Sequence, residues 1–122
     1  MKHVLWGRVV LGGLLAELAI FAIVIPLSLL AGQASLPLSA PPASFLATLI
    51  FGLWVARKAP RNRVLHGALV GVVAVVIYVA MSLGRPEPTA FIVAHVLKLL
   101  GGVVGGFLAS RRATTTVATD IR

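Results

Sequence analysis

The chain has 122 residues, 59% of them hydrophobic and 11% charged, with a formal net charge of +8 and no cysteine. Because about a quarter of the residues in a soluble domain are charged, this composition and its long apolar runs exclude a soluble domain and predict an all-α integral membrane bundle of four transmembrane helices. The lack of cysteine excludes disulfides, thiolate metal sites, iron–sulfur clusters and a cysteine nucleophile.

The first predicted span covers residues 4–30. Lys2 and Trp6 stand at its start, where a tryptophan suits the headgroup interface of a membrane. A cleaved signal peptide is the alternative, but the apolar run is too long for one and Glu17 interrupts it. Pro26 has no backbone N–H, so it predicts a bend toward the end of this span.

An uncharged segment with three prolines, residues 32–42, is predicted to form a short outer loop, and the second span covers residues 43–56. This span is short, so we expect its helix to begin at or before the prolines. Small or hydroxyl-bearing side chains recur every four residues along it and form a narrow stripe on which another helix can pack. They are Ser44, Thr48, Gly52 and Ala56.

The basic sequence R-K-A-P-R-N-R at residues 57–63 predicts a tight turn, and the third span follows at residues 64–83. Gly67 and Gly71 form a G-x-x-x-G spacing, which lets a second helix come close. His66 lies at the start of this span and is expected to face headgroups or water.

The fourth span covers residues 90–110, with His95 and Lys98 one helical turn apart near its middle. Two overlapping G-x-x-x-G spacings follow and predict helix contacts. Their members are Gly101, Gly102, Gly105 and Gly106. Residues 1–112 therefore form one transmembrane domain, and residues 113–122 are predicted to be a disordered cytoplasmic tail.

Basic residues are assigned mainly to one side of the membrane, which the positive-inside rule predicts to be the cytoplasm. They are Lys2, Arg8, Arg57, Lys58, Arg61, Arg63, Arg111, Arg112 and Arg122. Arg85 belongs to the opposite side. The prediction is a multi-pass protein of the bacterial inner membrane with both termini cytoplasmic. The positive charge then reports topology and not a nucleic-acid partner, and it should attract anionic lipid headgroups.

Glu17 and Lys98 are charged residues deep inside predicted spans, where an unanswered charge is costly. When the spans are levelled at their terminal arginines, Glu17 lies about four residues nearer the basic side, or ~6 Å at 1.5 Å per residue. A lysine side chain can bridge that difference, which predicts an ion pair. The alternative is a neutral Glu17 and a Lys98 bound by Ser44, because Cα–Cβ bonds tilt toward helix N-termini and aim the two side chains apart.

His95 falls at the depth of Tyr78 on the third span, which predicts a hydrogen bond between them. Haem ligation by His95 is the alternative. The sequence holds no H-E-x-x-H, D-x-D or other metal-ligand spacing. We therefore expect no metal, no cofactor, no catalytic residue and no enzymatic activity.

Two resemblances follow from short motifs. L-L-A-E-L at residues 14–18 resembles the placement of a glutamate in the small multidrug resistance transporters, whose Pro-Thr-Gly-x-Ala-Tyr and later tryptophan signatures are absent here. R-V-L-H-G-A-L-V-G at residues 63–71 and L-K-L-L-G-G-V-V-G-G-F-L-A-S-R-R at residues 97–112 resemble the YrzE-like four-span bacterial proteins. That resemblance covers about two-thirds of the chain and implies the fold, but no activity.

These patterns predict a structural or accessory membrane subunit that associates with itself or with a larger complex through its glycine-rich helix faces. The alternative is a small proton-coupled transporter or channel that uses Glu17. The two hypotheses differ in whether Glu17 binds and releases protons and in whether polar residues line a path.

Overall fold

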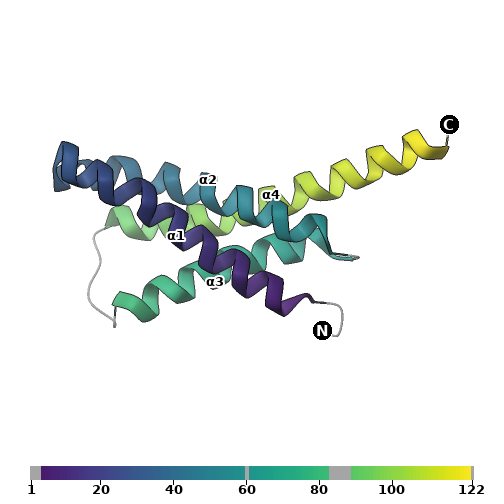
Figure 1. Ribbon diagram of the computed structural model, residues 1–122, viewed down its shortest axis with the longest axis horizontal. Helices are drawn as coiled ribbons and strands as arrows, with labels where there is room; N and C mark the ends of the chain where they lie inside the picture. Colours follow the sequence, from purple (N-terminus) through teal and green to yellow (C-terminus); the bar gives the residue numbers. More distant parts are fainter. Residues whose placement is uncertain (1–3, 60, 83–88, 122) are drawn as a thin grey trace.

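The chain forms a bundle of long helices (Figure 1) in a computed structural model that describes residues 4–59, 61–82 and 89–121. The elements are α1 (Trp6–Ala31), the short 3₁₀ turn η1 (Gln33–Ser35), α2 (Leu36–Arg57), α3 (Arg63–Ser82) and α4 (Thr89–Ile121). Each of the four α-helices is long and apolar enough to cross a membrane, which confirms the predicted four-span, all-α fold. Lys2 and Arg85 lie outside the described residues.

The four helices are arranged so that α1 and α4 lie diagonally opposite each other. α4 packs against α2 and α3, and α1 packs against the same two helices. No backbone contact joins α1 to α4 within the described part of the chain. Side chains of α1 and α4 therefore meet only by reaching across the centre of the bundle.

α2 begins at Leu36, so most of the predicted outer loop at residues 32–42 is helical, and that part of the prediction is wrong. Pro37 lies in the first turn, where a backbone N–H would have no partner within the helix. Pro41 and Pro42 lie inside the helix, one turn further on. The expectation that this helix begins at or before the prolines is confirmed.

α4 continues as a helix to Ile121, beyond the rest of the bundle (Figure 1), whereas the sequence predicted a disordered tail from residue 113. No glycine or proline follows Gly106, so no residue interrupts the helix. The threonines of this segment are only modestly less favourable than alanine in a helix.

The six predicted helix-packing glycines all lie against other helices of this same chain. A Cβ atom on Gly102 would overlap the backbone of Gly67, and a Cβ atom on Gly67 would overlap the backbone of Gly102. Gly52 of α2 reaches the same level, since a Cβ atom there would stand 3.1 Å from the carbonyl oxygen of Gly102. Three helices thus meet backbone to backbone at this point, which we call the glycine layer (Gly52, Gly67 and Gly102).

The predicted stripe on α2 is buried along its whole length. A Cβ atom on Gly101 of α4 would overlap the Thr48 side chain, so this stripe faces α4. Its buried members are Ser44, Thr48, Gly52 and Ala56.

α1 also makes close contacts through two glycines outside the predicted packing set. A Cβ atom on Gly12 would stand 2.5 Å from Cγ2 of Val55 on α2, and one on Gly13 would overlap Val73 on α3. Adjacent glycines do not form a G-x-x-x-G spacing, so that spacing does not predict these contacts.

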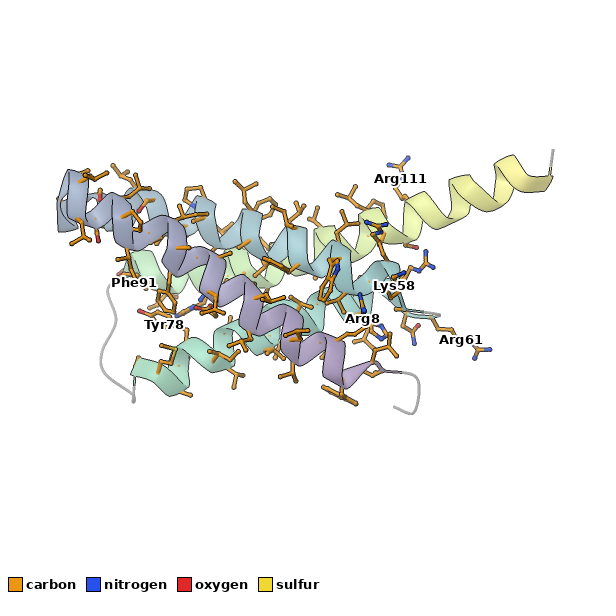
Figure 2. All side chains as sticks on the ribbon, in the orientation of Figure 1. Arg8, Lys58, Arg61, Tyr78, Phe91 and Arg111 are labelled. Carbon is orange, nitrogen blue, oxygen red and sulfur yellow. The ribbon has the colours of Figure 1, made fainter. Side chains whose placement is uncertain are left out.

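Basic side chains gather at one end of the bundle, which we call the basic end. Figure 2 shows Arg8, Lys58, Arg61 and Arg111 there. Arg8 Nη2 donates a 3.5 Å hydrogen bond to the carbonyl oxygen of Trp54, and its guanidinium lies 4.4 Å from the centre of the Trp54 ring. The grouping of these side chains on one side agrees with the sequence prediction.

The outer surface of the bundle is apolar. Large hydrophobic side chains are exposed on all four helices, among them Leu29, Leu38, Met81 and Ile92. Such a surface is a liability in water, but lipid tails are as apolar as leucine and suit it well.

Candidate functional site

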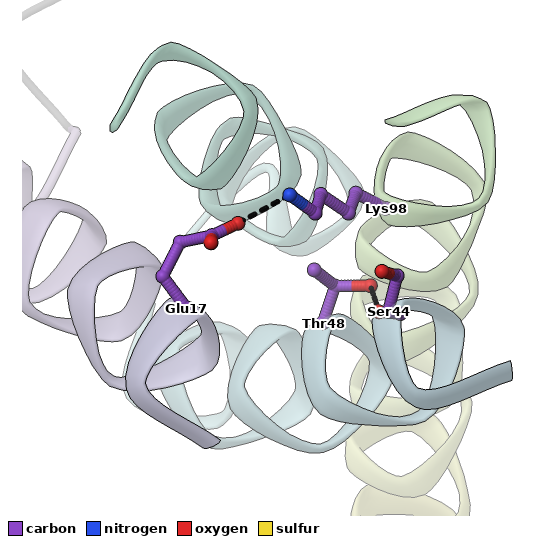
Figure 3. A network of polar contacts seen from close by, with 4 residues as sticks. All are labelled: Glu17, Ser44, Thr48 and Lys98. Carbon is purple, nitrogen blue, oxygen red and sulfur yellow. Dashed lines mark hydrogen bonds and ion pairs between the residues drawn. The ribbon is translucent and has the colours of Figure 1, made fainter. Parts of the chain in front are cut away.

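The candidate site is centred on a buried ion pair between α1 and α4. Lys98 Nζ contacts Glu17 Oε1 (Figure 3), as the sequence predicted. Glu17 is 1% exposed and Lys98 is 2% exposed. The pair therefore bridges the two helices that make no backbone contact.

The Cα–Cβ bonds of Glu17 and Lys98 were expected to aim the two side chains apart. The lysine side chain is long enough to reach Glu17 nevertheless. Figure 3 shows the Lys98 side chain extended toward Glu17 and away from Ser44, which excludes the alternative arrangement for this conformation. Ser44 is buried on α2 close by. Thr48, one turn further along α2, donates its hydroxyl to the Ser44 carbonyl oxygen at 2.8 Å.

The two oxygens of the Glu17 carboxylate are in different situations. Oε1 faces Lys98, whereas Oε2 is buried with no hydrogen-bond partner among the described residues. A buried ion pair stabilises a fold only when its remaining polar atoms are also satisfied. Glu17 Oε2 is therefore a buried oxygen whose negative charge Lys98 does not contact directly.

Aromatic side chains cover the pair on the side away from the basic end. The Tyr78 ring centre lies 4.7 Å from Lys98 Nζ and 4.9 Å from the His95 ring centre. Tyr78 also stacks on Phe91 of α4 at 6.1 Å and on Phe21 of α1 at 6.5 Å. The sequence placed Tyr78 and His95 together correctly, and the predicted hydrogen bond between them stays a prediction.

A cavity of about 40 Å³ begins at Lys98 and extends toward the end opposite the basic end. All four helices contribute to its wall. The lining residues are Ile20, Phe21, Val24, Ala40, Ser44, Tyr78, Phe91, Ala94, His95 and Lys98. Glu17 is not among them, so Lys98 stands between the cavity and the carboxylate.

On the basic-end side of the ion pair, the described residues of the bundle pack closely. Val9, Val55 and Val70 form a fully buried apolar cluster between α1, α2 and α3. The glycine layer brings α2, α3 and α4 into contact beside it. The cavity thus reaches Lys98 from the side away from the basic end, while closely packed described residues lie on the other side of the ion pair.

His66 is fully buried near the basic end, so the expectation that it faces headgroups or water is wrong. The Leu5 N–H donates to Nε2 at 3.1 Å, and Nδ1 lies 2.9 Å from the carbonyl oxygen of Asn62. A carbonyl oxygen can only accept, so Nδ1 carries the proton and the ring is neutral. Leu5, directly before α1, makes this contact with His66. No local sequence pattern predicts it.

No protein-family model matches this chain, and neither a curated protein nor a solved structure matches it. The likeness to the YrzE-like proteins and to the small multidrug resistance transporters therefore stays a prediction. In the described part of the chain, no three histidine, cysteine or acidic side chains come together as a metal site.

The arrangement can perform two elementary steps. Glu17 can accept a proton, which removes its attraction for Lys98, and Lys98 can then offer its ammonium to another anion. Both groups are out of water, so a change of charge on either one must be compensated nearby.

Proposed function

We propose that this protein is a small proton-coupled transporter of a bacterial inner membrane, with Glu17 as the proton-binding group and Lys98 as its partner. The observation that carries the proposal is the position of the ion pair, whose Lys98 lines a cavity on the side away from the basic end. Ionisable side chains inside a membrane are costly in free energy, so such a pair is a candidate functional site.

The direction of the cavity follows from the charges. By the positive-inside rule, the basic end lies in the cytoplasm, so the cavity faces the periplasm. The closed valine cluster and glycine layer then separate Glu17 from the cytoplasm. This is an outward-facing state, and transport requires a second state in which the basic end opens.

A purely structural role explains the site less well. Replacing a buried ion pair with apolar residues is often neutral or stabilising, so such a pair is weak evidence for stability. A structural pair would also be expected to have well-satisfied oxygens and close packing. Here one carboxylate oxygen lacks a hydrogen-bond partner among the described residues, and a cavity adjoins the lysine.

The glycine-rich faces are not available to bind a second protein, which weakens the hypothesis of an accessory subunit that associates through them. The glycines that motivated it are buried against helices of the same chain. Association with a second copy or with a larger complex remains a prediction, and it requires a different surface.

Proton uptake into vesicles tests the proposal. The purified protein is reconstituted into liposomes that contain the pH dye pyranine, in a buffer of potassium chloride, nitrate and phosphate. Valinomycin is added so that potassium movement balances any net charge. After an external acid pulse, vesicles with the wild-type chain should acidify faster than protein-free vesicles, and vesicles with Glu17→Gln should match the protein-free ones.

The matched control is Ala80→Leu, at an exposed position on α3. This variant should acidify the vesicles at the wild-type rate. Wild-type vesicles that acidify no faster than protein-free vesicles would contradict the proposed function. Infrared titration in lipid gives an independent check, because only three acidic residues contribute carboxyl bands.

A further inference from the structure

We propose that the substrate of this transporter is a small monovalent anion, which Lys98 holds in the cavity while Glu17 carries the accompanying proton. The inference rests on the proposed function and names its substrate class. It follows from the size of the cavity, the sign of the charge that lines it and the charge balance of the ion pair.

The size of the cavity limits the substrate to a few atoms. A water molecule needs about 10–15 Å³ of such space, and the cavity offers about 40 Å³. It therefore has room for roughly three water-sized groups by that measure. Chloride or nitrate meets this limit, whereas a sugar acid does not.

The charge that lines the cavity selects an anion. Lys98 is the charged side chain among the lining residues, and its carboxylate partner lies behind it. The aromatic rings of Phe21, Tyr78 and Phe91 form much of the remaining wall. A cation would meet the ammonium first and be repelled, while an anion would be attracted by it.

Charge balance couples the anion to a proton. The Glu17–Lys98 pair is neutral overall, so an anion entering the cavity adds one uncompensated negative charge, which is costly inside a membrane. A proton from the external water then forms an O–H bond on the Glu17 carboxylate, and the ion pair with Lys98 breaks. Lys98 keeps its own proton and pairs with the anion, so the loaded site is neutral again.

Release reverses these steps on the other side. The anion leaves Lys98, the proton leaves Glu17 for water, and the ion pair forms again. The other titratable groups that face the pair are His95 on α4 and Tyr78 on α3, and α2 contributes only the hydroxyl side chains of Ser44 and Thr48 among the described residues. One proton and one anion cross together, with no net charge moved.

Anion replacement in the pyranine vesicles tests the inference. Wild-type vesicles are compared in potassium chloride, potassium nitrate and potassium gluconate, each with and without valinomycin. We expect proton uptake in chloride or nitrate and a rate equal to protein-free vesicles in gluconate. Valinomycin should not change the rate, because the cycle moves no net charge.

Two variants fill the cavity without changing the ion pair. Ala94→Leu and Ala40→Leu each add side-chain volume at buried positions in the cavity wall, and either should reduce uptake to the protein-free rate. Ala80→Leu again serves as the control for a larger side chain elsewhere. Thermal unfolding in detergent identifies a variant that has merely lost its fold. The uptake rate of the other, folded variant then tests whether the cavity is required.

The outcomes separate this inference from the function on which it rests. Equal uptake in gluconate and chloride would overturn anion coupling while leaving proton transport intact. Acceleration by valinomycin would also overturn it, because it would mean that protons cross alone. No uptake under any condition would refute the proposed function, and the anion inference with it.

Discussion

Alanine at Gly71 should push α4 away from α3 and destabilise the bundle. A Cβ atom at this position would stand 2.6 Å from the carbonyl oxygen of Lys98 and 3.0 Å from Cα of Leu99. Both are backbone atoms, which cannot rotate away as the end of a side chain could. Gly71 therefore sets the position of the helix segment that carries the Lys98 side chain.

The size of the effect follows from the required shift. Close C–H···O contacts between helices have C···O distances of about 3.3–3.6 Å, so α4 must move by about 0.7–1 Å to clear the new carbon. Gaps of that size forfeit a quarter to a half of the dispersion attraction at the surrounding contacts. Overpacking of this kind costs about 1–3 kcal/mol, and the better helix propensity of alanine returns about 0.5–1 kcal/mol.

Thermal or denaturant unfolding of the purified protein in detergent measures the result. Gly7→Ala is the matched control, because no atom lies within 4 Å of its added Cβ atom. This control should be unchanged or slightly stabilised, whereas Gly71→Ala should unfold more easily. A Gly71→Ala variant as stable as Gly7→Ala would refute the close approach of α3 and α4.

Three further predictions concern the ion pair, the topology and the buried histidine. Glu17→Gln and Lys98→Met should each destabilise the fold by about 3–5 kcal/mol, because each strands a buried charge, and the double variant should recover much of that loss in an unfolding assay; additive losses would show that the two residues are uncoupled. A cysteine at Ser35 should react with an impermeant maleimide in intact cells and one at Asn62 should not, and labelling of Asn62 would reverse the proposed orientation. His66→Phe should cost about 1–3 kcal/mol in the same unfolding assay, because it leaves the part-buried Leu5 N–H without its acceptor; an unchanged stability would mean that water replaces the imidazole.

Counting residues from the arginines at the span ends places Glu17 and Lys98 within reach of each other, although it left a contact between Lys98 and Ser44 open. Helices of known direction have a fixed rise per residue, so the sequence alone gives the relative depths of Glu17 and Lys98. The same count places Tyr78 beside His95. Depth does not reveal which helices are neighbours, and the diagonal arrangement of α1 and α4 could not be predicted.

The cavity depends on that arrangement and therefore has no signature in the sequence. Its lining comes from all four helices, and most of the lining residues are ordinary apolar side chains such as Ile20 and Val24. The glycine spacings predicted close helix contacts correctly but did not identify the partner helix. That omission led to the hypothesis of association between separate chains, whereas Gly67 and Gly102 meet within one chain.

Two errors have local causes. Prolines in the segment 32–42 suggested a loop, yet Pro37 lies in the first turn of α2, where a proline loses no hydrogen bond, and α2 continues through Pro41 and Pro42. A histidine at the end of a span is normally exposed, yet Leu5, directly before α1, donates a backbone hydrogen bond to the His66 ring. Both depend on where a neighbouring residue lies, and the periodicity of a single helix contains no such information.

Proton uptake by the double variant Glu17→Gln/Lys98→Met tests the central claim most directly. Removing both charges leaves no stranded partner, so the fold should persist. If the pair exists to carry a proton, vesicles with this folded variant should acidify no faster than protein-free vesicles. A double variant that acidifies them at the wild-type rate would contradict the account and reduce the Glu17–Lys98 pair to a structural bridge.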